Sequence, residues 1–152
     1  MNRSTKGFTL VEILIVVIIL GILAAIVIPQ FTQASDDARL SALQSDLQTV
    51  RSQLELYNVQ HGNYPDMKYS AGAWAADTAN FVARLTGTTD QYGDTTKTGY
   101  GPYLQKFPTN MFNTLDTVRV GGAAAGAGTS GWHFDTTTNK FSADDSAAHA
   151  AM

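Results

Sequence analysis

The chain has 152 residues, a formal net charge of −3 and no cysteine. This length fits one modest hydrophobic core, and the missing cysteines exclude disulfides, Cys-based zinc sites and Cys nucleophiles. The acidic balance argues against nucleic acid as a partner. Charged residues make up 15 % of the chain, below the ~25 % of an average soluble domain, so part of the surface is not that of an ordinary soluble protein.

Residues 8–28 account for this low charge, because Thr9 and Glu12 are their only polar interruptions. As a helix with a rise of ~1.5 Å per residue, this segment would match a hydrocarbon core ~30 Å thick. A buried core helix is the weaker alternative, since such helices rarely stay apolar on every face. We therefore expect a helix that spans a membrane and is surrounded there by lipid.

The charges on either side of this segment predict its orientation. Arg3 and Lys6 precede it, and the part of the chain beyond it has eight Lys and Arg against twelve Asp and Glu. This bias predicts an N-terminus in the cytoplasm and a C-terminal part across the membrane. A removed signal peptide is the alternative, with a weak cleavage site at residues 24–25. Because the apolar run continues to Ile28, longer than a signal core of 7–15 residues, we expect the segment to be retained.

Glu12 is the anomaly of the apolar segment. A carboxylate inside a spanning helix costs a few kcal/mol unless it has a partner, and such a residue indicates function. Its place near the cytoplasmic end would lower this cost by letting the side chain reach the interface. Taken alone, Glu12 therefore leaves both explanations open.

The residues around Glu12 carry a resemblance to a known family: Lys6-Gly7-Phe8-Thr9-Leu10-Val11-Glu12. Followed by an unbroken aliphatic helix and Pro29, this stretch resembles the start of type IV prepilins, which type IV pilins and the pseudopilins of type II secretion share. The resemblance covers the chain up to Pro29 and, more loosely, to about residue 60. It implies a leader of residues 1–7, a membrane peptidase that cuts after Gly7 and methylates the new N-terminus of Phe8, and an assembly role for Glu12.

Elementary electrostatics gives this motif a rationale. Cleavage converts the nitrogen of Phe8 from an amide into an amine, which is protonated near neutral pH even after N-methylation. Phe8 and Glu12 lie about 6 Å apart along a helix axis. At 4 Å and an effective dielectric constant near 20, such a pair attracts by about 4 kcal/mol before desolvation is subtracted. We hypothesise that Glu12 sets subunit register by pairing with the Phe8 amine of an adjacent subunit.

Residues 29–61 continue the helix with a different pattern. Pro29 removes one helical hydrogen bond and crowds the preceding turn, which predicts a kink or local melting. Beyond it, apolar residues recur every three or four positions, as a single stripe needs: Leu40, Leu43, Leu47, Val50, Leu54 and Tyr57. We expect this stripe to pack on the sheet of its own domain, with a short coiled coil as the alternative. Gly62 and Pro65 are typical of a helix end.

Residues 62–152 are predicted to form a globular head. Residues 74–85 suggest a short helix and 86–101 a loop. Three short strands are expected from β-branched and aromatic residues: 117–120, 132–135 and 140–143. The last two form a hairpin with Trp132, Phe134 and Phe141 inward. The predicted fold class is α+β, a long N-terminal helix packed on a small antiparallel sheet.

Several apparent sites in the head do not carry chemistry. Gly126–Gly131 has the spacing G-x-G-x-x-G, but the strand-like run from Trp132 follows where a dinucleotide site needs a helix. The three histidines are scattered. Asp144, Asp145 and His149 are expected to be exposed tail residues, which make a poor cage for a metal. No serine elbow or carboxylate pair marks a catalytic centre, so we predict no enzyme.

The family resemblance also raises calcium, because major pseudopilins often hold this ion through an Asp- and Gly-rich loop near the C-terminus. Here Asp144 and Asp145 stand without the flanking glycines of that pattern, so no metal and no cofactor is expected. The resemblance further implies partners: other copies of the chain, related pseudopilins, the prepilin peptidase and an inner-membrane assembly platform.

The small, cysteine-free head favours a structural subunit of a type II secretion pseudopilus. A type IV pilus subunit for adhesion, motility or DNA uptake is the alternative, and a membrane-anchored exported enzyme or binding module is the third. We expect a single-pass protein of the bacterial inner membrane, with the N-terminus in the cytoplasm and the head in the periplasm. The filament would be periplasmic or lie on the cell surface.

Overall fold

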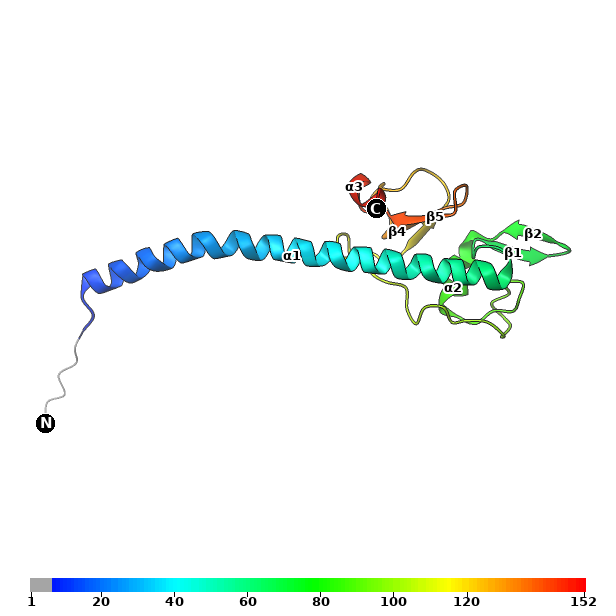
Figure 1. Ribbon diagram of the computed structural model, residues 1–152, viewed down its shortest axis with the longest axis horizontal. Helices are drawn as coiled ribbons and strands as arrows, with labels where there is room; N and C mark the ends of the chain where they lie inside the picture. The colour runs from blue at the N-terminus through cyan, green and yellow to red at the C-terminus, as the bar shows by residue number, and fades with distance from the viewer. Residues whose placement is uncertain (1–6) are drawn as a thin grey trace, which may run out of the picture. The chain divides into compact units, whose positions relative to one another are not determined.

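The computed structural model describes residues 7–152, and residue 29 only through its helical backbone. Arg3, Lys6 and all of the predicted leader except Gly7 lie outside the described residues. The long N-terminal helix is confirmed as α1, Leu10–His61 (Figure 1). The chain divides into two compact units, one ending at residue 38 and the other comprising residues 39–152, so α1 contributes to both.

In the first unit, α1 leaves its apolar side chains exposed. Between Leu10 and Ile28 the large apolar side chains are from 41 % (Val27) to 82 % (Leu10) exposed. This part of α1 is long and apolar enough to cross a membrane, by length and composition. The helix continues through residue 29, and the kink at Pro29 remains a prediction.

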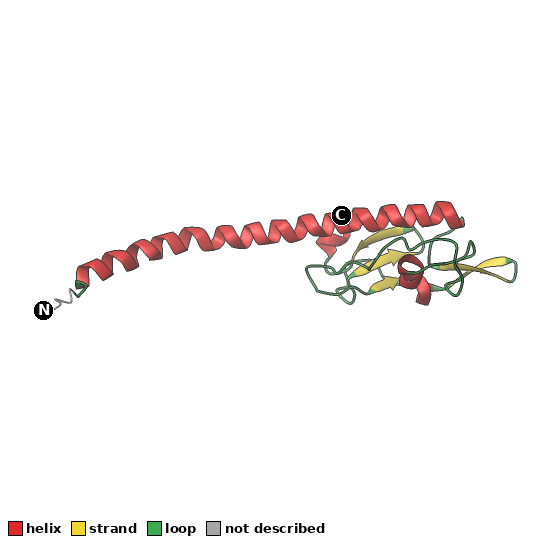
Figure 2. Ribbon diagram, turned by 90° about the horizontal axis from the view of Figure 1, so that it is seen from below, coloured by secondary structure: helices red, strands yellow, loops and turns green. Residues whose placement is uncertain are grey.

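In the second unit, the predicted stripe of α1 is buried in the head from Leu43 to Tyr57, which confirms packing on the domain's own sheet, while its first residue, Leu40, is half-buried. Leu43 and Leu54, like the residues of the stripe between them, are no more than 2 % exposed. Figure 2 shows the C-terminal part of α1 lying alongside the strands and a short helix of the head. The core draws on this stripe, the sheet, the short helix and the loop that follows it: Leu43, Leu47, Val50, Leu54, Tyr57, Phe81, Leu85, Leu104, Phe107, Trp132, Phe134, Phe141 and Ala143.

The C-terminal end of α1 follows the predicted signal. Gly62 adopts a left-handed φ of +76° and donates its backbone N–H to the carbonyl of Asn58 at 2.8 Å. A residue in this conformation just after a helix caps its last carbonyls, and glycine adopts it without a steric penalty. The helix therefore ends at His61.

The region after α1 corrects one prediction. The helix expected over residues 74–85 begins only at α2, Phe81–Thr86, after the 3₁₀ turn η1, Thr78–Asn80. Residues before it form an antiparallel hairpin of β1, Met67–Ser70, and β2, Ala73–Ala76 (Figure 1). Its turn places both Ala71 and Gly72 at positive φ, as a type I′ turn requires. Cross-strand pairing thus overrides the helical tendency of the alanines.

The main sheet has the order β3-β4-β5, with β3 at Val118–Val120, β4 at Trp132–Asp135 and β5 at Lys140–Ala143. The β4–β5 hairpin is antiparallel, as predicted. However, β3 runs parallel to β4, so the sheet is mixed where an antiparallel one was expected. Residues 121–131, which we call the glycine loop, return the chain between these parallel strands. The α+β class is confirmed.

Candidate functional site

The predicted cleavage junction lies just before the first turn of α1. Gly7, Phe8 and Thr9 precede the helix, which begins at Leu10. Phe8 is 83 % exposed, and among the described residues no atom apart from those of Gly7 and its chain neighbours lies within 4 Å of the position that a Cβ on Gly7 would occupy. A peptide bond in an exposed, non-helical segment is open to proteolysis. The geometry is therefore compatible with cleavage after Gly7.

Glu12 closes the start of α1 in a reciprocal arrangement with Thr9. The Thr9 backbone N–H and the Thr9 hydroxyl each donate to Oε2 of Glu12 at 2.8 Å, and the Glu12 N–H donates to Thr9 Oγ1 at 3.3 Å. This is a capping box, which satisfies backbone donors that the first helical turn leaves without partners. A carboxylate inside an apolar segment is thus held at the helix end nearest the cleavage junction.

Thr9 was missed as a functional residue, although its signal was present in the sequence. Thr9-Leu10-Val11-Glu12 has the threonine and glutamate spacing of a capping box before an apolar run. The pairing of Glu12 with a neighbouring Phe8 amine involves a cleaved second subunit and stays a hypothesis.

In the head, the three histidines lie apart, and among residues 7–152 no group of three or more His, Asp or Glu side chains converges on a metal position. His61 bonds through Nε2 to the Tyr103 hydroxyl at 2.9 Å, and its ring stacks on Tyr57. His133 contacts the carbonyl of Gly121 at 3.1 Å. His61 and His133 therefore each have a structural partner within the head.

Asp144 corrects the expectation of an exposed tail carboxylate, because its side chain is fully buried. Arg119 donates to both of its oxygens, at 2.7 and 3.2 Å, and the Ser130 hydroxyl donates at 2.6 Å. The amides of Gly126 and Ala127 complete the set at 2.9 and 3.2 Å. Burial raises the pKa of Asp144, but these hydrogen bonds outweigh it and lower the pKa to about 2.

Its neighbour Asp145 is paired differently. Asp145 Oδ2 lies 2.5 Å from Nδ1 of His149, in the short helix α3, Ala147–Ala150. Its other oxygen accepts a hydrogen bond from the Asn110 side chain at 2.8 Å. Asp145 and His149 are thus paired, and with side chains 6 % and 19 % exposed they too differ from the expected exposed tail residues, whereas Asp144 points away into the glycine loop.

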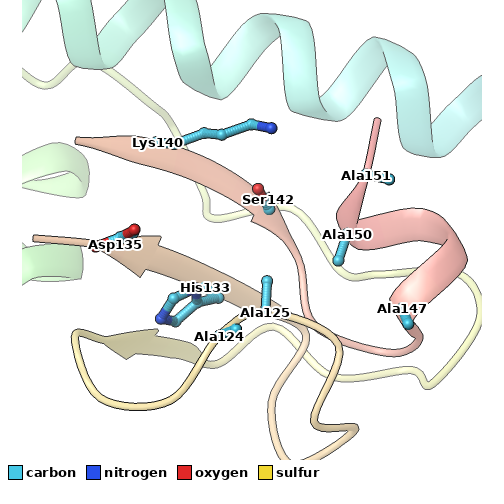
Figure 3. Close-up of a pocket in the computed structure, with 9 residues that line it drawn as sticks. All are labelled: Ala124, Ala125, His133, Asp135, Lys140, Ser142, Ala147, Ala150 and Ala151. Carbon is cyan, nitrogen blue, oxygen red and sulfur yellow. The ribbon is translucent and has the colours of Figure 1, made fainter. Parts of the chain in front are cut away.

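A pocket of about 330 Å³ lies on the outer face of the β4–β5 hairpin, under the glycine loop and α3 (Figure 3). Its polar side chains are His133, Asp135, Lys140 and Ser142, and alanines supply the rest of the lining. Asp135 accepts hydrogen bonds within its own turn, from Thr137 and Thr138. The pocket shows no nucleophile held by a base, which a covalent catalytic centre needs.

Comparison with known proteins confirms the resemblance at the N-terminus. Residues 2–28 match the family model described as the prokaryotic N-terminal methylation motif. Type II secretion system core protein G of Pseudomonas aeruginosa is 41 % identical over 64 residues, which are 42 % of this chain and 45 % of that protein. The same-named protein of Dickeya chrysanthemi is 37 % identical over 73 residues, 48 % of each chain.

Pilins are also similar to this chain. The type IV major pilin protein PilE1 of Neisseria gonorrhoeae is 38 % identical over 72 residues, 47 % of this chain and 44 % of that protein. The chain thus matches about half the length of these curated relatives, and no solved structure matches it. The methylation motif, these relatives and the α+β architecture with its long N-terminal helix together make the chain pilin-like.

Proposed function

We propose that this chain is a structural subunit of a type II secretion pseudopilus. It is stored in the inner membrane through residues 8–28, cut after Gly7, methylated on Phe8, and assembled through α1 into a filament that supports protein export. The observation that carries this proposal is the exposed apolar start of α1, with one carboxylate, Glu12, held beside the junction.

The exposed apolar residues of the first unit need a partner in every state of the protein. In the membrane that partner is lipid, and in a filament it is the corresponding segment of neighbouring subunits. Exchanging acyl chains for other apolar side chains costs little transfer free energy. The same helix can therefore serve both for storage and for assembly.

Glu12 gives this otherwise non-directional packing a register. In the single chain its carboxylate accepts both Thr9 hydrogen bonds on Oε2. Cleavage creates a cation on Phe8, and a cation in an apolar interface is stable only beside a counter-ion. Glu12 is the only acidic residue between Phe8 and Ile28. It is therefore the one counter-ion in this segment with which the Phe8 amine of a neighbouring subunit can pair.

The processing step is tested by the intact mass of protein recovered from cells with a prepilin peptidase. We expect the mass to fall by residues 1–7 and to rise by one methyl group. A Gly7→Val variant is expected to keep its leader. Recovery of the wild type with residues 1–7 attached would support the membrane-anchored enzyme or binding module instead, and a start beyond residue 25 would indicate a removed signal peptide.

The assembly step is tested with a matched pair of substitutions, because the chain has only two glutamates. Glu12→Gln should leave membrane insertion and cleavage intact but abolish filaments. Glu55→Gln, on the head half of α1, should keep them, since Glu55 is exposed and bonds to Tyr64 in the same chain. Normal filaments from Glu12→Gln would refute the pairing hypothesis.

A type IV pilus subunit is the second candidate, favoured by the similarity to the gonococcal major pilin. Export assays separate the two functions. The chain is introduced into a secretion strain that lacks its major pseudopilin and into a piliated strain that lacks its major pilin. Restored export supports the pseudopilus, and restored surface fibres without export support the pilus.

A further inference from the structure

The glycine loop is held from inside by one arginine. The Arg119 guanidinium donates through Nη1 to the carbonyls of Gly121, at 3.2 Å, and Ala123, at 2.5 Å. Through Nη2 it donates to the carbonyl of Ala124 at 3.1 Å. Its remaining bonds go to the buried carboxylate of Asp144. A positive charge thus stands where loop carbonyls and a carboxylate converge.

Carbonyl and carboxylate oxygens around a cation are also the ligands that calcium prefers, and the family resemblance suggests calcium for the C-terminal part of the head. The donor set around Asp144 does not fit that ion. Its two oxygens already accept five hydrogen bonds, whose N–H and O–H dipoles point their positive ends at the carboxylate. A dication there would displace these donors and meet the guanidinium charge.

We propose that Arg119 is a built-in cation that closes the glycine loop, so that this head holds its C-terminal region together without calcium. The fixed fork of a guanidinium suits this task, because it presents several donors in one plane to separate acceptors. The inference concerns the head alone and does not depend on which filament the chain builds.

The loop in turn positions the end of the chain. Gly126 has a φ of +94°, and a Cβ there would lie 2.8 Å from the backbone of Ala147 in α3. Two alanines of the loop, Ala124 and Ala125, lie beside His133 in the pocket that α3 also lines (Figure 3). Opening the loop would therefore loosen both the pocket wall and its contact with α3.

Amide hydrogen exchange on the full chain in detergent micelles tests the proposal, because Gly126 and Ala127 donate their amides to Asp144. Loop exchange and the Tm of the wild type should be the same in millimolar calcium chloride and in a calcium chelator. Arg119→Gln should speed loop exchange on the order of tenfold or more and lower the Tm by on the order of 10 °C. The segment 43–57 should stay protected.

Arg39→Gln is the matched control, since Arg39 is exposed on α1 outside the loop, and it should change neither quantity. Faster loop exchange or a lower Tm of the wild type in chelator would overturn the proposal, and so would wild-type loop exchange in Arg119→Gln. Should Arg119→Gln fail to fold, Arg119→Lys replaces it. This variant keeps the charge but loses the fork, so faster loop exchange supports the proposal and unchanged exchange overturns it.

Discussion

The two halves of α1 have the same backbone conformation but opposite surfaces. Between Leu10 and Ile28 the large apolar side chains are exposed, whereas those of the stripe from Leu43 to Tyr57 are buried. The first half is apolar on every face and the second on one. The difference shows that helical conformation alone does not decide what a helix contacts, since the distribution of apolar residues around it does.

The two halves of α1 also differ in how far their polar side chains reach for hydrogen-bond partners. In the first half, the described side-chain bonds of Glu12 join it to Thr9, the residue just before the same helix. In the second half, Arg51 reaches across to the sheet and to the chain's C-terminus. The described hydrogen bonds of the Glu12 side chain are thus local, whereas those of Arg51 connect α1 to distant parts of the head.

The largest expected effect on head stability comes from shortening a buried side chain of the stripe. Leu47→Ala should lower the free energy of unfolding by about 2–5 kcal/mol, because Leu47 is only 2 % exposed and its loss leaves a cavity. Urea unfolding of the full chain in micelles, followed by the fluorescence of the two tryptophans of the head, Trp74 and the buried Trp132, measures this. Leu20→Ala, in the exposed half, should leave head stability unchanged. Equal losses in both variants would contradict the distinction between the halves.

A smaller loss in the free energy of unfolding is expected when the hydrogen bonds between α1 and the sheet are removed. Arg51 donates through Nε to the carbonyl of Phe141 and through Nη2 to the backbone oxygen of Met152, both at 2.9 Å. Arg51→Met keeps most of the aliphatic stem and should cost about 1.5 kcal/mol, the lower range for charge-assisted hydrogen bonds. The same unfolding assay applies, with the exposed Arg39→Met as control. An Arg51→Met variant as stable as this control would show that these bonds do not anchor the helix.

Periodicity along the chain made the second half of α1 predictable. A stripe with steps of three and four residues can be buried only as one helical face. In the strands, the alternation of apolar and polar residues predicted the burial of Trp132, Phe134 and Phe141, which are all no more than 1 % exposed. Such local patterns also predicted the hairpin and the helix end at Gly62. In the apolar half, the threonine and glutamate spacing would have predicted the capping box as well.

Features that depend on distant partners were not predictable in this way. The β1–β2 turn uses Ala71, a residue without a turn preference, at positive φ. The parallel pairing of β3 with β4 joins strands across the glycine loop. The burial of Asp144 depends on Arg119, which lies far away in the sequence and whose own pattern gives no hint of this contact. Local sequence fixes neither which strands pair nor which charges meet.

A substitution at the C-terminal end of α1 is expected to have a smaller effect on head stability, and one in the first half to have none. Gly62→Ala should cost about 1 kcal/mol, because an alanine at a φ of +76° is strained by its Cβ. Gly62→Asn should cost less, since asparagine tolerates this conformation. Gly21→Ala is the control in the first half, where no described atom beyond the adjacent residues and the local helix backbone lies within 4 Å of the added Cβ, and it should not destabilise the head. A Gly62→Ala variant as stable as the wild type would contradict this account of the helix end.

The smallest effect is a pH dependence at the last residue of α1. Burial lowers the pKa of His61 from 6.5, and the hydrogen bond to the Gln91 carbonyl and the charge of Asp90 partly offset this effect. As the pH falls below 6.5, the unfolded chain takes up a proton at His61 before the folded head does, so the free energy of unfolding falls with it. Burial raises the pKa of Asp66, which changes the free energy of unfolding in the opposite direction.

Urea unfolding at pH 7.5 and pH 5.5 should therefore be compared between the wild type and His61→Gln. Both proteins carry the contribution of Asp66, and only the wild type carries that of His61. The wild type should lose more stability than the variant over this interval, and identical losses would show that His61 is not held neutral by the head.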